Sequence, residues 1–248
     1  MGLRPVQLNV KALDHAAVGR FWAEALGWSA YDTGSGVTTY VGPTGGLVWP
    51  NPVTIGIDVV AVPEPGTTTK NRVHLDLATT SVAHQTGLVA RLRALGATPA
   101  DVGQADVGWT VLADPEGNEF RVLEPRETYR DTGPIAAVVV DCADPGDMAR
   151  FWAGAMDWTL HEVTDNYAAL RSANGTGPYL EFLRTPGGKT VPDRLHLDLL
   201  PYPGDDRAAE VARLRTLGAT DLDVGQGDVP WTCLIDPDGH EFCVLALP

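Results

Sequence analysis

Arg-Val-His-Leu-Asp-Leu at residues 72–77 returns as Arg-Leu-His-Leu-Asp-Leu at residues 194–199. Around this hexapeptide, residues 71–123 align without a gap on residues 193–245, and 30 of the 53 aligned positions are identical. Identity at this level over such a length does not arise by chance, so the chain contains an internal repeat. Within each hexapeptide, apolar residues alternate with Arg, His and Asp, which predicts a strand with one face toward the core.

The repeat extends beyond this segment, and each half of the chain shows the element order β-α-β-β-β twice. Phe21, Trp22 and Ala23 pair with Phe-Trp-Ala at residues 151–153, at an offset of 130 instead of 122, so the second half is eight residues shorter in between. Alternating apolar residues, capping residues and turn-forming Gly and Pro define the elements of the first half. They are a strand at 6–13, a helix at 14–27, short strands up to 63, a strand at 71–78, a helix at 81–95 and a hairpin at 109–123.

A polar stretch with two prolines and one glycine, residues 125–134, separates the two halves. Such a stretch interrupts both helices and strands and is typical of a linker. We therefore predict one domain at residues 1–127 and a second, similar domain at residues 132–248.

Length and composition narrow the classes of protein. The 248 residues, 44% of them hydrophobic, suit two folded domains and exclude an intrinsically disordered chain. The net charge of −14 opposes binding to phosphate backbones and anionic membranes, so we expect neither nucleic acid nor membrane partners. No segment approaches the roughly 20 apolar residues of a membrane span. Three cysteines, an odd number, and the absence of a signal-peptide pattern predict a reduced protein of the cytoplasm.

Four motifs, each repeated in whole or in part in the second half, carry a resemblance to a known family. They are Phe-Trp with the later Leu-Gly at 21–27, the hexapeptide at 72–77, Leu-x2-Leu-Gly-Ala at 92–97 and Asp-Pro-x-Gly-Asn at 114–118. Both halves resemble the vicinal oxygen chelate superfamily of glyoxalases, extradiol dioxygenases and bleomycin-resistance proteins, and within it the glyoxalase-like domains common in actinobacteria. The resemblance implies an α+β fold of tandem domains, each of two βαβββ modules that form a cup-shaped mixed sheet with helices on the outer face.

In metal-dependent members of this superfamily, four strands of a cup each provide one ligand. The first half has, at the corresponding positions, Gln7, Asp58, His74 and Arg121. The second half has Ala137, Glu181, His196 and Cys243. Arg121 departs from the pattern because a guanidinium cannot bind a cation, and Ala137 has no donor atom. Cys243 is a soft ligand that favours zinc or copper.

Some fused members of the superfamily build each site from both halves. The combination that suits zinc is Gln7, Asp58, His196 and Cys243. The opposite combination, in which Ala137 and Glu181 join His74 and Arg121, is not a metal site. We therefore predict no cofactor, with zinc or another divalent metal as the alternative. In the favoured interpretation, His74 and His196 are polar pocket residues that form hydrogen bonds near Asp76 and Asp198, respectively.

Several other residues admit two interpretations. Cys233 and Cys243 flank a turn symmetrically and are expected to face each other across a hairpin, as two buried thiols rather than as a disulfide or a soft-metal pair. Trp109 and Trp231 each open a strand, where they belong either to the core or to the ligand-stacking wall of a cup. The four histidines outside the repeated pattern are expected at the surface. They are His15, His84, His161 and His240.

The function that we favour is a metal-independent small-molecule binding protein of the sequestration or resistance type. Its ligand would be cationic or aromatic, with polar contacts from Arg121, His74 and Asp76 and stacking on the tryptophans. The wider set of candidate ligand-binding residues adds Asp198, Cys243, Trp231, Gln7 and Asp58. The incomplete metal-ligand sets and the acidic composition favour this hypothesis. We expect the protein to be a monomer or a homodimer.

The alternative is an enzyme of the glyoxalase or lyase type in small-molecule or secondary metabolism. In it, His196 and Glu181 act as general acid and base, or hold a divalent metal with Cys243, and His74 is a further catalytic candidate. The histidine and carboxylate retained in each half favour this second hypothesis.

Overall fold

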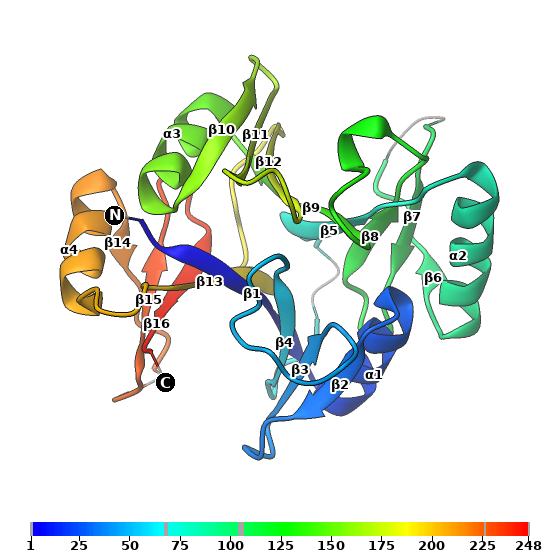
Figure 1. The fold of residues 1–248 in the computed structure, drawn as a ribbon, viewed down its shortest axis with the longest axis horizontal. Helices are drawn as coiled ribbons and strands as arrows, with labels where there is room; N and C mark the ends of the chain where they lie inside the picture. The colour runs from blue at the N-terminus through cyan, green and yellow to red at the C-terminus, as the bar shows by residue number, and fades with distance from the viewer. Residues whose placement is uncertain (1, 67–68, 104–106, 226, 248) are drawn as a thin grey trace.

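The computed structural model describes residues 2–66, 69–103, 107–225 and 227–247, which form four modules in chain order (Figure 1). Module one has β1 (Arg4–Ala12), α1 (His15–Leu26), β2 (Ser29–Asp32), β3 (Thr38–Gly42) and β4 (Gly56–Ala61). Module two has β5 (Val73–Leu77), α2 (Val82–Ala94), β6 (Thr98–Pro99), β7 (Thr110–Ala113) and β8 (Glu119–Val122). The short helix η1 (Glu127–Tyr129) follows in the linker.

The second half repeats this order. Module three has β9 (Ile135–Cys142), α3 (Pro145–Ala155), β10 (Trp158–Val163), β11 (Tyr167–Ser172) and β12 (Tyr179–Arg184). Module four has β13 (Leu195–Leu200), α4 (Arg207–Leu217), β14 (Thr220–Asp221), β15 (Trp231–Ile235) and β16 (Glu241–Leu245). The β-α-β-β-β order predicted from the sequence is confirmed in all four modules.

The strands form two eight-stranded mixed sheets. The first sheet has the order β14-β15-β16-β13-β1-β4-β3-β2, and the second has the order β10-β11-β12-β9-β5-β8-β7-β6. The four helices lie toward the periphery, with α4 and α2 at opposite ends of the molecule (Figure 1). The α+β fold of paired modules expected from the resemblance is confirmed.

Each sheet combines one module from each half of the sequence. In the first sheet, β1 of module one pairs antiparallel with β13 of module four, which sets Gln7 opposite Asp198. In the second sheet, β5 of module two pairs antiparallel with β9 of module three, which sets Asp76 opposite Ala137. The boundary predicted between residues 127 and 132 separates the sequence repeats, but both sheets extend across it.

The repeated Phe-Trp and Asp-Pro motifs meet where a helix packs on a hairpin turn. The side chain of Asp14 accepts a hydrogen bond from the amide of Ala17 and caps α1. The indole of Trp22 on α1 donates to Asp114 at 3.2 Å, and the indole of Trp152 on α3 donates to Asp236 at the same distance. These contacts tie module one to module two, and module three to module four.

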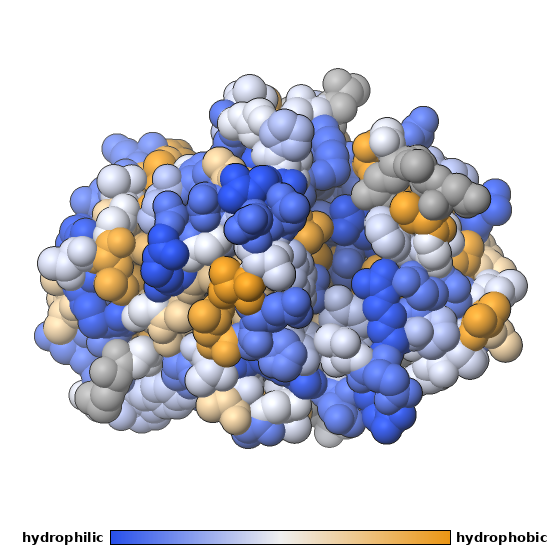
Figure 2. All heavy atoms as spheres, turned by 90° about the horizontal axis from the view of Figure 1, so that it is seen from above, coloured by the Kyte–Doolittle hydropathy of each residue, from blue (hydrophilic) through white to orange (hydrophobic). Residues whose placement is uncertain are grey.

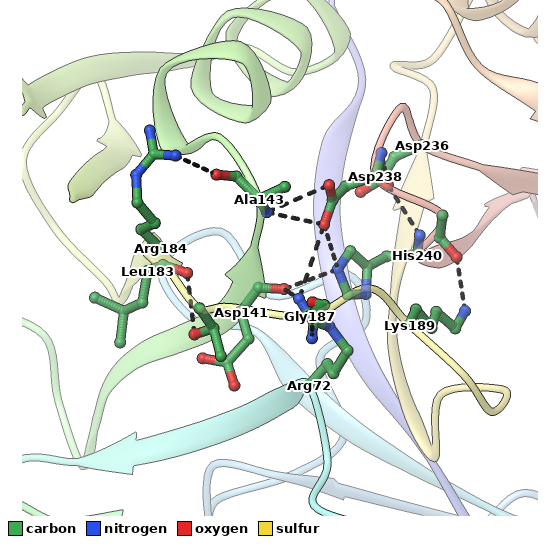
Figure 3. Close-up of polar contacts among 12 residues, drawn as sticks. Arg72, Asp141, Ala143, Leu183, Arg184, Gly187, Lys189, Asp236, Asp238 and His240 are labelled. Atoms are coloured by element: carbon green, nitrogen blue, oxygen red, sulfur yellow. Dashed lines mark hydrogen bonds and ion pairs between the residues drawn. The ribbon is translucent and has the colours of Figure 1, made fainter. Parts of the chain in front are cut away.

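His240 is not at the surface, where the sequence placed it, but buried at a junction between modules. Its Nδ1 donates to Asp193 and its Nε2 donates to the carbonyl oxygen of Asp141 on β9, both at 3.0 Å. Figure 3 shows the ring between Asp141 and Asp238. Burial lowers the pKa of His240, but hydrogen bonds to Asp193 and Asp238 outweigh it and raise the pKa to about 10.

The viewed face of the molecule is mostly hydrophilic, with small separate hydrophobic patches (Figure 2). The exposed apolar side chains include Leu47, Val48 and Val53 on the loop between β3 and β4. Within the part of the chain that the structure describes, no helix has the length and hydrophobicity that crossing a membrane requires.

Candidate functional site

The face of the second sheet that carries His74, Asp76, Arg121 and Glu181 is here called the second cup. β5 presents His74 and Asp76, because its three alternating apolar residues pack into the core on the other face. Nε2 of His74 lies 3.6 Å from Oδ1 of Asp76, and Nη1 of Arg121 lies 3.8 Å from Oδ2 of Asp76. The structure therefore brings together three residues that the sequence analysis placed in one ligand site.

A cavity of about 310 Å³ opens in the second cup. Its lining includes four residues that the sequence pattern indicates as candidates, Asp76, Trp109, Arg121 and Glu181. The pattern does not indicate the other charged and aromatic residues of the wall, which are Arg126, Tyr129, Glu162 and Tyr167. Tyr129 lies on η1, in the linker, which has no counterpart in the internal repeat. Its part in the cavity therefore depends on tertiary structure alone.

Burial dominates the electrostatics of the second cup. It raises the pKa of Asp76 to about 7, although Arg121 opposes the shift. Burial also raises the pKa of Glu181, which accepts a hydrogen bond of 2.8 Å from the hydroxyl of Tyr129 and another from Tyr167. The pKa of His74 is lowered by burial and by Arg121, so its imidazole is neutral at pH 7. The carboxyl groups of this cavity thus carry less negative charge than their number indicates.

Two guanidinium groups pack against the aromatic wall of the cavity. Arg121 and Arg126 each lie with Cζ 5.6 Å from the centre of the Trp109 ring, and Arg126 lies 5.9 Å from the centre of the Tyr129 ring. Arg121 stands at the position of a metal ligand in the resemblance, and Ala137 of β9 supplies no donor. The residues of the second cup therefore do not fit a divalent metal.

The first cup is the face of the first sheet that carries Gln7, Asp58, His196 and Cys243. The Gln7 amide is engaged at both ends, since its Nε2 donates to Asp198 at 2.9 Å and its Oε1 accepts from the indole of Trp49 at 2.8 Å. Burial and the nearby Asp198 raise the pKa of Asp58 to about 7. Trp49, on the loop between β3 and β4, was not among the candidates.

The zinc set inferred from the resemblance is not assembled in the first cup. Among the described residues, one group of His, Cys, Asp or Glu side chains is compact enough to hold a metal ion. It consists of His196, Asp198 and Cys243, whose ligand atoms all lie within 4.8 Å of one another. Asp58 lies outside this group, and both polar atoms of Gln7 already have partners. The carboxylate next to His196 is that of Asp198, two residues later on β13, and not that of Asp58.

One pairing of the alternative hypothesis is wrong. His196 on β13 belongs to the first sheet and Glu181 on β12 belongs to the second, so they cannot act together as acid and base in one site. Glu181 shares its cup with His74 instead. Across the β15–β16 hairpin, Cys233 faces Cys243 as expected, and the two buried sulfur atoms are 3.4 Å apart. Trp231, at the start of β15, is 39% exposed and so is not a core residue.

Comparisons with solved structures agree with the fold. The chain is similar over 99% of its length to glyoxalase I from Zea mays, with a TM-score of 0.62, 15% identity and 92% of that chain covered. It is similar over 99% of its length to a putative dioxygenase from Bacillus subtilis subsp. subtilis str. 168, with a TM-score of 0.63, 13% identity and 86% of that chain covered. Identities this low support the fold and not the activity.

The sequence itself matches a family model in both halves. The model of the glyoxalase-like domain matches residues 7–123 and residues 137–245, which together make up most of the chain. A search of curated proteins found no match. The chain therefore belongs to the glyoxalase-like domain family of the vicinal oxygen chelate superfamily, with two copies of the domain in tandem.

Proposed function

We propose that this protein is a metal-independent small-molecule binding protein of the sequestration or resistance type, and that its ligand site is the cavity of the second cup. The observation that carries the proposal is the position of Arg121, whose guanidinium lies 3.8 Å from the carboxylate of Asp76 and 5.6 Å from the centre of the Trp109 ring. A guanidinium repels metal cations, but it offers several N–H donors to a ligand.

The cavity favours a planar aromatic ligand with hydrogen-bond acceptors. Its volume of about 310 Å³ is near the lower end of the range for small-molecule sites. Trp109, Tyr129 and Tyr167 offer aromatic surface, while Arg121 and Arg126 offer donors. A simple aliphatic cation fits less well, because the raised pKa values of Asp76 and Glu181 reduce the negative charge available to it.

Titration calorimetry on chelator-treated protein tests this proposal with three probe classes: hydroxylated aromatic acids, aromatic ammonium ions and tetraalkylammonium ions. We expect the aromatic probes to bind and the tetraalkylammonium ions not to bind. Trp109→Leu should weaken binding about five- to tenfold, since an aromatic contact contributes about 1 kcal/mol. The matched control is Trp231→Leu, which changes the same repeat position in the first cup and should leave the affinity unchanged.

Two results would contradict the proposal. One is an equal loss of affinity in Trp109→Leu and Trp231→Leu, which would place the ligand outside the second cup. The other is binding that appears only after a divalent metal is added back to the chelated protein.

A second candidate function, a metal-independent enzyme, is favoured by one observation. Asp76 lines the cavity, and its pKa of about 7 suits proton transfer near neutral pH. For an enzyme, Asp76→Asn should retain binding of an aromatic probe and lose its conversion, and the wild-type rate should rise with pH through about 7 as Asp76 ionises. If the wild-type protein does not convert the probe, the binding function explains the site better than the enzymatic one.

A further inference from the structure

The residues of the second cup do not fit a metal, but the first cup brings together donors of which two, Asp198 and Cys233, lie outside the ligand positions of the family. Cys243, His196 and Asp198 form a compact group, and Cys233 faces Cys243 from the neighbouring strand. We propose that these four side chains, all from module four, form a zinc site with two thiolates, one imidazole and one carboxylate. This proposal is independent of the function proposed for the second cup.

Three of the distances between these donors are close to the edges of a tetrahedral zinc site. Sγ of Cys243 lies 3.6 Å from Nε2 of His196, Nε2 of His196 lies 3.3 Å from Oδ1 of Asp198, and the sulfur atoms of Cys233 and Cys243 are 3.4 Å apart. With Zn–S bonds of about 2.3 Å and Zn–N and Zn–O bonds of about 2.1 Å, the corresponding tetrahedral edges are about 3.6, 3.4 and 3.8 Å. His196, Asp198 and Cys243 therefore approach zinc geometry as they stand, whereas the side chain of Cys233 lies outside this compact group and has to turn toward it to complete the site.

Asp198 provides an independent indication of a ligand. Its side chain is 3% exposed, and its Oδ1 has no hydrogen-bond partner. An unpartnered buried carboxylate oxygen is costly, and a bound cation would remove this cost. The other oxygen, Oδ2, accepts a hydrogen bond from Gln7, which in turn accepts one from Trp49. Gln7 therefore orients Asp198 rather than binding the metal itself.

The internal repeat shows that the thiols are specific to module four. The positions of Cys233 and Cys243 correspond in module two to Val111 and Arg121, which also face each other across their hairpin. The His and Asp of the hexapeptide are present in both modules. A valine and an arginine cannot bind a metal, whereas two thiolates and an imidazole favour zinc over magnesium or manganese.

Cobalt(II) titration of the full chain, reduced with a phosphine and then freed of metal, tests the proposal. We expect one equivalent of cobalt to give thiolate-to-cobalt charge-transfer absorption and tetrahedral ligand-field bands, and zinc to displace it. Cys243→Ser and Cys233→Val should each lower the intensity of the charge-transfer band by about half, because one of two thiolates is lost, or weaken zinc binding by roughly 10- to 100-fold. Cys233→Val uses the residue that module two carries at this position, so the β15–β16 hairpin should be retained, which circular dichroism checks.

The matched control is Cys142→Ala, which removes the buried cysteine of β9 in the second sheet and should leave the cobalt spectrum unchanged. Three results would overturn the proposal: no stoichiometric cobalt or zinc binding by the reduced protein, a cobalt spectrum without a thiolate band, or full binding by folded Cys233→Val. If Asp58→Asn abolishes binding while Cys233→Val retains it, the metal is bound by the set from both halves of the chain, Gln7, Asp58, His196 and Cys243, and the site proposed here is wrong.

Discussion

A pair of repeat positions shows how two residues change the chemistry of a shared scaffold. In module two, the turn residue Asn118 accepts a hydrogen bond from the amide of Asn71 at 3.2 Å. In module four, the corresponding pair is His240 and Asp193, which form a charged contact of 3.0 Å. Lys189 lies 3.1 Å from the same carboxylate. The neutral pair of one copy has therefore become a buried ionic network in the other.

Replacing His240 with the residue of the other copy should make stability less dependent on pH. The pKa of about 10 in the folded protein lies above the ordinary histidine value of 6.5, so the stabilising contribution of His240 is complete below pH 6.5 and is lost as the pH rises through 10. His240→Asn should lower the free energy of unfolding by about 3 kcal/mol near pH 6 and by clearly less near pH 10.

Urea unfolding at the two pH values measures both losses, and the exposed His161→Asn serves as the control. An equal loss for His240→Asn at both pH values would show that the charge of His240 does not contribute. In that case, packing alone would explain the effect of the substitution.

At the scale of elements, two glycines of the helices have open space around them but different backbone conformations. Gly27 caps the C-terminus of α1 in the left-handed region, at a φ of 67°, and its amide donates to the end of the helix. Gly87 lies exposed in the interior of α2 with ordinary helical geometry. An added Cβ would meet nothing within 4 Å at either position, so only the backbone distinguishes them.

Alanine should therefore have opposite effects at these two positions. Gly27→Ala is expected to destabilise the protein by about 1 kcal/mol, because an L-residue is strained in the left-handed region. Gly87→Ala should stabilise it by about 0.5–1 kcal/mol, because alanine loses less backbone entropy in a helix. Thermal unfolding of the two variants beside the wild type measures the difference, and a change of the same sign in both would show that backbone conformation does not decide it.

At the scale of the whole molecule, both sheets depend on pairing between the two halves of the chain. The antiparallel pairs β1–β13 and β5–β9 join modules that are distant in sequence. Each half alone would leave the strands β1 and β5, or β9 and β13, without these partners. Because the full chain completes both sheets internally, we expect it to be a monomer in solution.

Fragments of residues 1–127 and 132–248 should therefore fold only in combination. Separately, each is expected to lack a cooperative urea transition or to associate with itself, since unpaired strand edges bind other strands. Mixed in equal amounts, they should form a one-to-one complex with the circular dichroism spectrum of the intact chain. Analytical ultracentrifugation with urea unfolding tests this, and a fragment that unfolds cooperatively as a monomer would contradict it.

The secondary-structure elements could be predicted from the sequence, whereas contacts between distant residues could not. The strand at β5 was predicted because alternation along it is local, and α1 because Asp14 and Gly27 bound it. The burial of His240 was not predicted, because its partners Asp193 and Asp141 lie far away in the sequence. Tyr129 was missed as well, because its hydrogen bond to Glu181 joins the linker to a strand 52 residues later.

The sequence by itself determined the repeat, the four modules and the face of each strand that carries polar residues. These properties follow from a period of two residues in strands and from caps and turns of a few residues, so they need no knowledge of the partner strand. Only the tertiary structure decided which modules share a sheet, and hence that Gln7 meets Asp198, 191 residues away, while His196 and Glu181 are separated. Alternation specifies the direction of a side chain, but the partner across a sheet depends on the packing of the whole chain.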